Sequence, residues 1–207
     1  MKASVIIPNL NGAGWLQDSI ESVWAQTEQD FELIVIDNGS TDESLDIARS
    51  YCGRDRYTLI ENAGNTGFSH AVNQGIAIAK GEYMALFNND ALRYYEPELA
   101  DDAGDYVTIL GFACKRGDGL KASRYTKPCR VFSACGGAAP YRKSILDENA
   151  ECDELFFAYY EDVDLSWRAN NFGYRNVYCP TARCRHICGA TTGAVRYNPF
   201  KSIQSGR

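Results

Sequence analysis

Four runs of consecutive apolar residues lie in the first ninety positions of the chain. They are Ala3–Pro8, Phe31–Asp37, Tyr57–Glu61 and Glu82–Phe87, and the first of them is rich in β-branched residues. Continuous rather than alternating hydrophobicity is typical of strands that are buried on both faces of a parallel sheet. The pattern therefore predicts four neighbouring strands of one such sheet.

Helical patterns separate these runs. Apolar residues recur at helical spacing in Trp15–Thr27. A second helix is expected to follow Ser40, with Glu43 as its capping-box partner. A third is expected over about 69–80, with Gly81 as a stop signal. The alternating order of strands and helices predicts an α/β fold with right-handed crossovers.

Short polar side chains and glycines follow each apolar run. The segments are Pro8–Gly12, Asp37–Asp42, Glu61–Phe68 and Asn88–Asp90. Ligands of open α/β sheets bind at the carboxyl ends of the strands. Turn formation explains any one of these segments. Four together, above all Asn-Asn-Asp directly after a buried strand, favour a binding site.

The type of ligand is narrowed by two motifs that the sequence lacks. Neither G-x-x-x-x-G-K-[ST] nor G-x-G-x-x-G is present, which disfavours P-loop enzymes and dinucleotide binders. A bound diphosphate would need another countercharge. A divalent metal held by a carboxylate at a strand end is the obvious source.

Composition adds few constraints. The 207 residues, 45% hydrophobic and 23% charged, fit one folded domain, and the net charge of -6 gives nucleic-acid binding no support. No apolar run could span a bilayer, and the start of the chain resembles a strand more than a signal peptide.

Eight cysteines without an export signal indicate reduced thiols in the cytoplasm. A zinc site in Cys179–Cys188, which includes His186, stays open although its spacings are unusual.

A cluster of acids in the second half is another candidate for chemistry. Glu161, Asp162 and Asp164 begin a predicted helix that ends near Gly173. Acids at a helix start also suit the helix dipole, so spacing alone favours capping and general-base catalysis equally. Asp164 and Arg168 have the spacing of a structural ion pair.

Together these segments resemble the family 2 glycosyltransferases with the GT-A fold, especially the bacterial rhamnosyltransferase-like branch. The resemblance implies a three-layer α/β/α sandwich with a mostly parallel central sheet. It also implies one domain over 1–207, with a nucleotide-binding half (1–90), an acceptor and catalytic half (100–190) and a tail (191–207). The matching blocks are SVIIPNLNG (4–12), IVIDNGSTDES (34–44), NAGNTGFSHAVNQGI (62–76), GEYMALFNND (81–90), FFAYYEDVDLSWRANNFGY (156–174) and His186.

The resemblance also implies site residues. Asp162 matches the catalytic base, with Glu161 beside it. Asp90 and His186 match ligands of Mg²⁺ or Mn²⁺, while Asn88 replaces the first acid of the family's Asp-x-Asp motif. The acceptor side is assigned to Gly136, Gly137, Trp167 and Arg168. The donor side is assigned to Pro8, Asn9, Asn11, Asp37, Asn38, Asn65, Asn73, Asn88, Asn89 and Asp90.

The implied activity is metal-dependent, inverting transfer of a sugar from a nucleoside-diphosphate donor to a hydroxyl of a carbohydrate or lipid-linked acceptor. Rhamnose is one candidate sugar, and bacterial polysaccharide or glycolipid assembly is the implied context. We expect a cytoplasmic protein and leave a peripheral position at the inner face of the cell membrane open.

Three alternatives remain. A sugar-phosphate nucleotidyltransferase would use a similar sheet, but its glycine-rich basic loop after the first strand is absent. A non-catalytic, GT-A-like carbohydrate-binding domain is favoured by the short segment Ala91–Leu99, which is longer in the relatives. The intact set of Asp90, Asp162 and His186 argues against it. A zinc-stapled interaction module would use the cysteines near the end of the chain.

Overall fold

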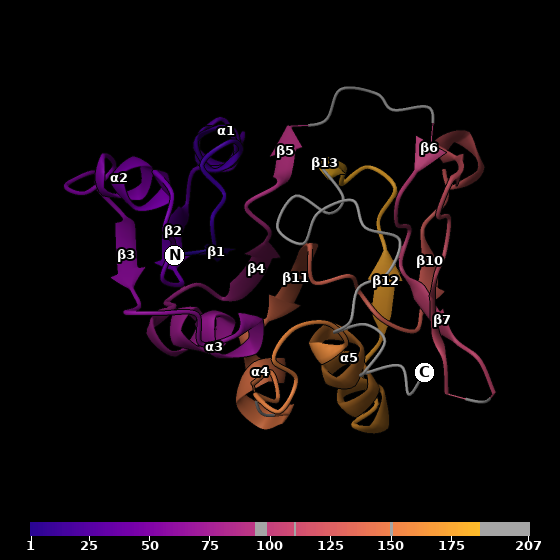
Figure 1. Cartoon of the computed structure of the whole chain (residues 1–207). Helices are drawn as coiled ribbons and strands as arrows, with labels where there is room; N and C mark the ends of the chain where they lie inside the picture. Colours follow the sequence, from indigo (N-terminus) through magenta and orange to yellow (C-terminus); the bar gives the residue numbers. More distant parts are fainter. Residues whose placement is uncertain (94–98, 110, 150, 187–207) are drawn as a thin grey trace.

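A five-stranded sheet forms the centre of the α/β part of the protein (Figure 1). The computed structural model describes residues 1–93, 99–109, 111–149 and 151–186. The strand order is β11-β4-β1-β2-β3. Four strands are parallel and β11 is antiparallel to β4, so the sheet is mostly parallel. The strands are β1 (Ala3–Asn9), β2 (Phe31–Asp37), β3 (Tyr57–Glu61), β4 (Tyr83–Phe87) and β11 (Ala138–Arg142).

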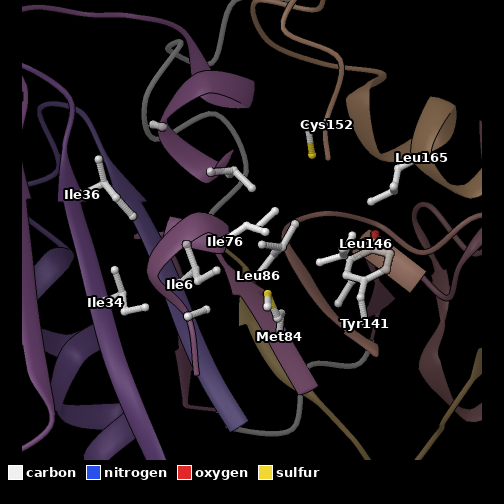
Figure 2. Packing of buried hydrophobic residues seen from close by; sticks show 14 residues of the cluster. Ile6, Ile34, Ile36, Ile76, Met84, Leu86, Tyr141, Leu146, Cys152 and Leu165 are labelled. Atoms are coloured by element: carbon white, nitrogen blue, oxygen red, sulfur yellow. The ribbon is translucent and has the colours of Figure 1, made fainter. Parts of the chain in front are cut away.

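Helices cover both faces of this sheet. Ile7, Val35 and their neighbours pack against α1 (Leu16–Trp24) and α2 (Ser44–Arg49). On the other face, Ile6 and Ile36 join a second cluster with three helices (Figure 2). Full burial of each such aliphatic side chain contributes about 1.5–3 kcal/mol. The three-layer α/β/α arrangement is therefore confirmed. The second set of helices is α3 (Phe68–Ile78), α4 (Lys143–Asn149) and α5 (Glu161–Asn171).

The other strands form short antiparallel pairs, in the right half of Figure 1. They were not predicted, because two or three residues are too few to show a period of alternation. The pairs are β5 (Ala91–Arg93) with β13 (Cys184–His186), β6 (Leu99–Ala100) with β9 (Leu120–Lys121), β7 (Asp105–Val107) with β8 (Ala113–Lys115), and β10 (Cys129–Val131) with β12 (Asn176–Tyr178); a short 3₁₀ helix, η1, spans Ala122–Arg124.

Two predicted helix signals are wrong. The second helix begins at Ser44, not directly after Ser40, because the Ser40 hydroxyl accepts a hydrogen bond from the Asn11 amide at 2.9 Å instead of capping a helix. The third helix already ends at Ile78. A Cβ on Gly81 would lie 2.4 Å from the Ala3 carbonyl carbon, so this glycine permits close contact with β1 rather than stopping a helix.

Two further predictions concern membrane-spanning helices and the tail of the chain. Within the described ranges, no helix has the length and apolarity needed to cross a membrane. The predicted tail, 191–207, lies outside the described residues.

Candidate functional site

The carboxyl ends of three adjacent strands are joined by hydrogen bonds between side chains. Asn9 and Asp37 are register partners on β1 and β2, and both are almost fully buried. Asn9 Nδ2 donates to Asp37 Oδ1 at 3.0 Å, and Asn89 Nδ2 donates to Asn9 Oδ1 at 2.7 Å. The Ser40 amide donates to Asp37 Oδ2 at 3.0 Å. Pro8 is buried in β1, directly before this group. The structure thus brings together residues from three of the predicted donor-site segments.

The loop after β1 is shaped to fit against this group. Asn11 has a left-handed backbone conformation, with a φ of 51°, and its amide is bonded to Ser40. A Cβ on Gly12 would lie 2.2 Å from Asn89 Nδ2 and 2.4 Å from Asn9 Oδ1. Only glycine at this position leaves room for the hydrogen bond between the two asparagines.

Asn38 holds the third strand-end loop in place. Its Nδ2 donates to Asn65 Oδ1 and to the Gly67 carbonyl, both at 3.1 Å. The next residue, Phe68, donates its amide to the Phe157 carbonyl at 2.6 Å. A Cβ on Gly67 would lie 2.8 Å from the Phe157 ring. The loop that carries Asn65 therefore packs against the segment that leads into α5.

A serine of α1 holds the Asn-Asn-Asp segment (88–90) in place. The hydroxyl of Ser19, which is fully buried, lies 2.6 Å from the Asn89 carbonyl and 2.8 Å from the Ala91 carbonyl. The peptides on both sides of Asp90 are thereby anchored, and the Asp90 side chain is buried. Asn88 Oδ1 is buried without a hydrogen-bond partner among the described residues.

These side chains suit a hard divalent cation. Mg²⁺ is usually held by one or two carboxylates together with substrate phosphates. Asp90 supplies a carboxylate, and Asn88 supplies an amide oxygen with unused acceptor capacity. His186 is paired with Ala91 through the backbone of β13, directly after Asp90, but its side chain lies outside the described residues. The described residues contain no cluster of three or more His, Cys, Asp or Glu that could hold a metal.

The predicted zinc site, Cys179–Cys188, also lies partly outside the described residues. Cys188 lies beyond the described residues. Cys179 and Cys184 are free thiols, and the Cys179 Sγ lies 3.3 Å from the Thr181 hydroxyl.

A two-glycine segment connects Asp162 to the Asn-Asn-Asp segment. The Gly136 amide donates to Asp162 Oδ2 at 2.8 Å, and the Asn88 amide donates to the Gly137 carbonyl at 3.0 Å. A Cβ on Gly136 would lie 3.3 Å from the Asp162 Cβ, a contact tighter than most. Gly136 and Gly137 were assigned to the acceptor side, and the structure places their backbone between the predicted base and the predicted metal site.

Burial raises the pKa values of both acids at the start of α5. The pKa of Glu161 is raised to about 8, mainly by burial and then by the nearby Asp162 charge. Burial also raises the pKa of Asp162, against the opposing effect of the Gly136 amide. The two preceding residues, Tyr159 and Tyr160, have φ values of 71° and 69°, which are strained for non-glycine residues. Perturbed acids next to a strained backbone are common at functional sites.

A second buried acid supports the glycine segment. Asp105 Oδ2 accepts a hydrogen bond from the Ser133 hydroxyl at 2.7 Å, and the Asp105 amide is bonded to the Ser133 carbonyl. Burial, and then the charge of Asp102, raise the pKa of Asp105 to about 7. Sequence reasoning gave no role to Asp105 or Ser19. A signal existed for Ser19, because it is a polar residue beside the apolar stripe of its helix.

Three further predicted residues lie apart from the strand-end group. Trp167 is 44% exposed and contacts Phe132 edge-on, with 5.2 Å between ring centroids. Arg168 is bonded to Asp164 at 2.8 Å, as the spacing indicated. Asn73 donates to the Cys152 carbonyl at 2.8 Å. Asn73 and Arg168 line one hollow of about 740 Å³, with Ile76, Leu146, Asp147, Glu151, Cys152 and Asp153.

The buried Glu161 predicts that stability depends on pH. Its folded pKa of about 8 lies above the reference value of 4.5, so the folded state retains a proton that the unfolded chain loses. The contribution of Glu161 to the free energy of unfolding is therefore fully present below about pH 4.5, and it is lost as the pH rises through about 8. Between about pH 6 and pH 8.5, Glu161→Gln should gain stability over the wild type by about 1 kcal/mol or more. Urea unfolding at the two pH values measures this. A constant difference would contradict the prediction.

Gly39, two residues after Asp37, is expected to be intolerant of a side chain. It has a φ of 78°, and a Cβ would lie 2.4 Å from the Gly64 Cα. The left-handed conformation disfavours alanine by about 1–2 kcal/mol, and the clash adds about 1–3 kcal/mol. Urea denaturation should show this loss for Gly39→Ala. Gly14→Ala is the matched control, because its Cβ would meet nothing within 4 Å. Equal stability of the two variants would refute the expected clash.

Comparisons with known proteins find similarity to glycosyltransferases. The sequence model described as "Glycosyl transferase family 2" matches residues 4–99. An uncharacterized glycosyltransferase of Rickettsia bellii is 27% identical over 173 residues, which are 74% of this chain and 25% of that protein. The chain spans between 15% and 28% of the length of the Rickettsia relatives that it matches.

Solved structures show the same fold. GalNAc-T7 with UDP, GalNAc and Mn²⁺ has a TM-score of 0.73 at 17% identity, over 90% of this chain and 44% of that one. The Pyrobaculum calidifontis mannosyltransferase in complex with GDP-Man and Mn²⁺ has a TM-score of 0.63 at 20% identity, over 88% and 56%. The fold of this protein is therefore the GT-A fold.

Proposed function

Since residues 4–99 match the sequence model of glycosyltransferase family 2, we propose that this chain belongs to that family and transfers a sugar from a nucleoside-diphosphate donor to an acceptor hydroxyl. One observation carries the proposal. The Gly136 amide is bonded to Asp162, and the neighbouring Gly137 carbonyl is bonded to Asn88. A candidate base and a candidate metal site are thus linked through two residues, and sugar transfer needs both groups in one site.

The donor occupies the carboxyl ends of the strands in this proposal. The base of the nucleotide contacts Asp37 and the residues bonded to it, Asn9 and Ser40. Asn65 lies on the loop held by Asn38 and faces the sugar and diphosphate. These assignments are supported by the meeting of the predicted segments at one sheet edge, where α/β folds bind ligands.

A divalent metal is part of the same site. Asp90 holds it, with Asn88 beside it and His186 as the expected further ligand. When bound, Mg²⁺ or Mn²⁺ neutralises the charge on the departing diphosphate and orients it. Two structural neighbours are described with Mn²⁺, which supports this choice of cofactor.

Asp162 acts as the general base. Its carboxylate takes the proton of the acceptor hydroxyl as the acceptor oxygen forms a bond to the anomeric carbon. The bond from that carbon to the diphosphate oxygen breaks on the opposite side, and its electron pair leaves with the nucleoside diphosphate. The result is inversion at the anomeric carbon. The raised pKa of Asp162 favours this role, because it makes the carboxylate a stronger base.

The acceptor is a carbohydrate or lipid-linked saccharide, and Trp167 offers an exposed ring on which a sugar can stack. Arg168 and Asn73, in contrast, hold the chain around the hollow beside α5. We place the protein in the cytoplasm, at the inner face of the membrane, as one domain over 1–207. Rhamnose remains a candidate sugar because of the branch that the sequence resembles.

A panel of sugar nucleotides tests the proposal. The purified chain is mixed with Mn²⁺, one donor and a set of saccharide acceptors, and released nucleoside diphosphate is measured. We expect release from one donor class that rises with one acceptor class. Release of pyrophosphate from a nucleoside triphosphate and a sugar phosphate would instead indicate a nucleotidyltransferase. Saccharide binding without release would indicate the non-catalytic alternative.

A further inference from the structure

An antiparallel hairpin presents apolar side chains to solvent. In the β7–β8 hairpin, Tyr106 and Phe112 are about half exposed and Ile109, near the tip, is fully exposed. The turn is closed by a hydrogen bond from the Thr108 amide to the Phe112 carbonyl at 2.9 Å. Figure 1 shows the hairpin projecting from the right edge, away from the parallel sheet. Its apolar surface is therefore not part of the core.

The same part of the chain is strongly basic. Residues 106–131 contain six lysines and arginines and one aspartate, a net charge of +5 in a chain whose total is -6. A local charge of this sign, in an otherwise acidic protein, indicates attraction to an anionic partner.

Four of these cations are available for a partner. Lys121, Arg124, Lys127 and Arg130 are exposed, and none forms an ion pair with another described residue. The other two are engaged within the protein. Lys115 is bonded to Asp101 at 2.8 Å, and the Arg116 guanidinium lies 4.7 Å from the centre of the Tyr125 ring.

Apolar and basic side chains alternate on this surface. Leu99 is directly opposite Lys121 in the β6–β9 pair, and both are exposed. Val177 is directly opposite Arg130 in the β10–β12 pair, and both are exposed. Directly opposed residues project from the same face of an antiparallel pair. Lys121 and Arg130 therefore each lie beside an exposed apolar side chain.

We propose that this basic hairpin surface (Leu99, Tyr106, Ile109, Phe112, Lys121, Arg124, Lys127, Arg130 and Val177) docks on an anionic lipid bilayer. Apolar side chains at a projecting tip can enter the boundary between headgroups and acyl chains, while lysine and arginine bind lipid phosphates. A second copy of the chain fits less well, because two surfaces with four exposed cations each would repel. A nucleic acid would use the charge but leave the fully exposed Ile109 without a partner.

The inference extends the proposed membrane location and needs no sugar transfer. Docking would place an acceptor held in the bilayer near the glycine segment, since β10 leads through Ser133 to Gly136. Because vesicle binding is measured without donor or acceptor, failure of this inference and failure of the proposed function are distinguishable.

Vesicle sedimentation tests the docking surface. The 207-residue chain is mixed with vesicles of phosphatidylcholine alone, or of phosphatidylcholine with phosphatidylglycerol at a molar ratio of about 7:3. We expect binding to the anionic vesicles that weakens with added salt. Ile109→Ser with Phe112→Ser should weaken it at least about tenfold. Lys121→Gln with Arg124→Gln should weaken it about 25-fold, at about fivefold for each charge.

Matched substitutions elsewhere serve as controls. Ile78→Ser and Lys80→Gln replace an exposed isoleucine and an exposed lysine at the end of α3, on another part of the molecule (Figure 1). Both should bind like the wild type, and circular dichroism should show all variants folded. Absence of binding, or equal binding by the hairpin variants, would overturn the proposal. A dimer that both hairpin variants abolish would assign the surface to a second copy instead.

Discussion

Asp162→Asn is expected to slow sugar transfer by about 10²–10⁴-fold, the usual contribution of a general base. The amide keeps the size of the carboxylate, and its oxygen can still accept the hydrogen bond from the Gly136 amide. The glycine segment and the predicted metal site should therefore keep their positions. Affinity for nucleoside diphosphate should stay unchanged, and only turnover should fall. Release of nucleoside diphosphate in the presence of acceptor measures the first effect, and calorimetry measures the second.

Asp164→Asn is the matched control for this prediction. Asp164 lies on the same helix turn, but its carboxylate is bonded to Arg168 and not to the glycine segment. We expect transfer to continue at a rate close to that of the wild type. Full activity of Asp162→Asn, or an equal loss in both variants, would contradict the assignment of Asp162 as the base.

Asp90→Ala is expected to remove the metal-dependent part of donor binding, and transfer with it. Lewis-acid stabilisation of a departing diphosphate is worth several kcal/mol, so the rate should fall by on the order of 10²-fold or more. In contrast to Asp162→Asn, the affinity for nucleoside diphosphate in Mn²⁺ should fall as well. Titration with and without Mn²⁺ separates the two effects.

An exposed acid on α1 supplies the control for Asp90. Asp18→Ala removes the same charge from the surface one residue before Ser19, the residue that anchors the peptides around Asp90. It should leave metal-dependent binding intact. If Asp90→Ala binds as tightly as this control in Mn²⁺, Asp90 is not a metal ligand.

Long buried strands were the part of the fold that sequence predicted best. The bounds of β2 and β3 agree with prediction at both ends. For β2, whose residues are all buried, the reason is that a strand covered on both faces requires an uninterrupted apolar run. Helix starts were predicted less well. The hydroxyl of Ser40 suits a helix cap and a loop contact equally, and only the tertiary position of Asn11 decides between them.

Asn9, Asp37 and Asn89 meet where the ends of β1, β2 and β4 meet, which the α/β order implied. The link between Gly136 and Asp162 could not be predicted, because it joins residues 26 positions apart through a backbone amide. The basic hairpin surface also escaped prediction. Its strands are too short to show a period, and its charge is hidden in a sequence whose net charge is negative.

Calorimetric titration of the chain with uridine, guanosine and thymidine diphosphates, with and without Mn²⁺, tests the central claim most directly. The claim is that the strand ends around Asp37 and Asp90 form a metal-dependent donor site. We predict that one of the three nucleotides binds, and that its binding requires the metal. A folded protein that binds none of them under either condition would contradict the donor site and favour a non-catalytic role.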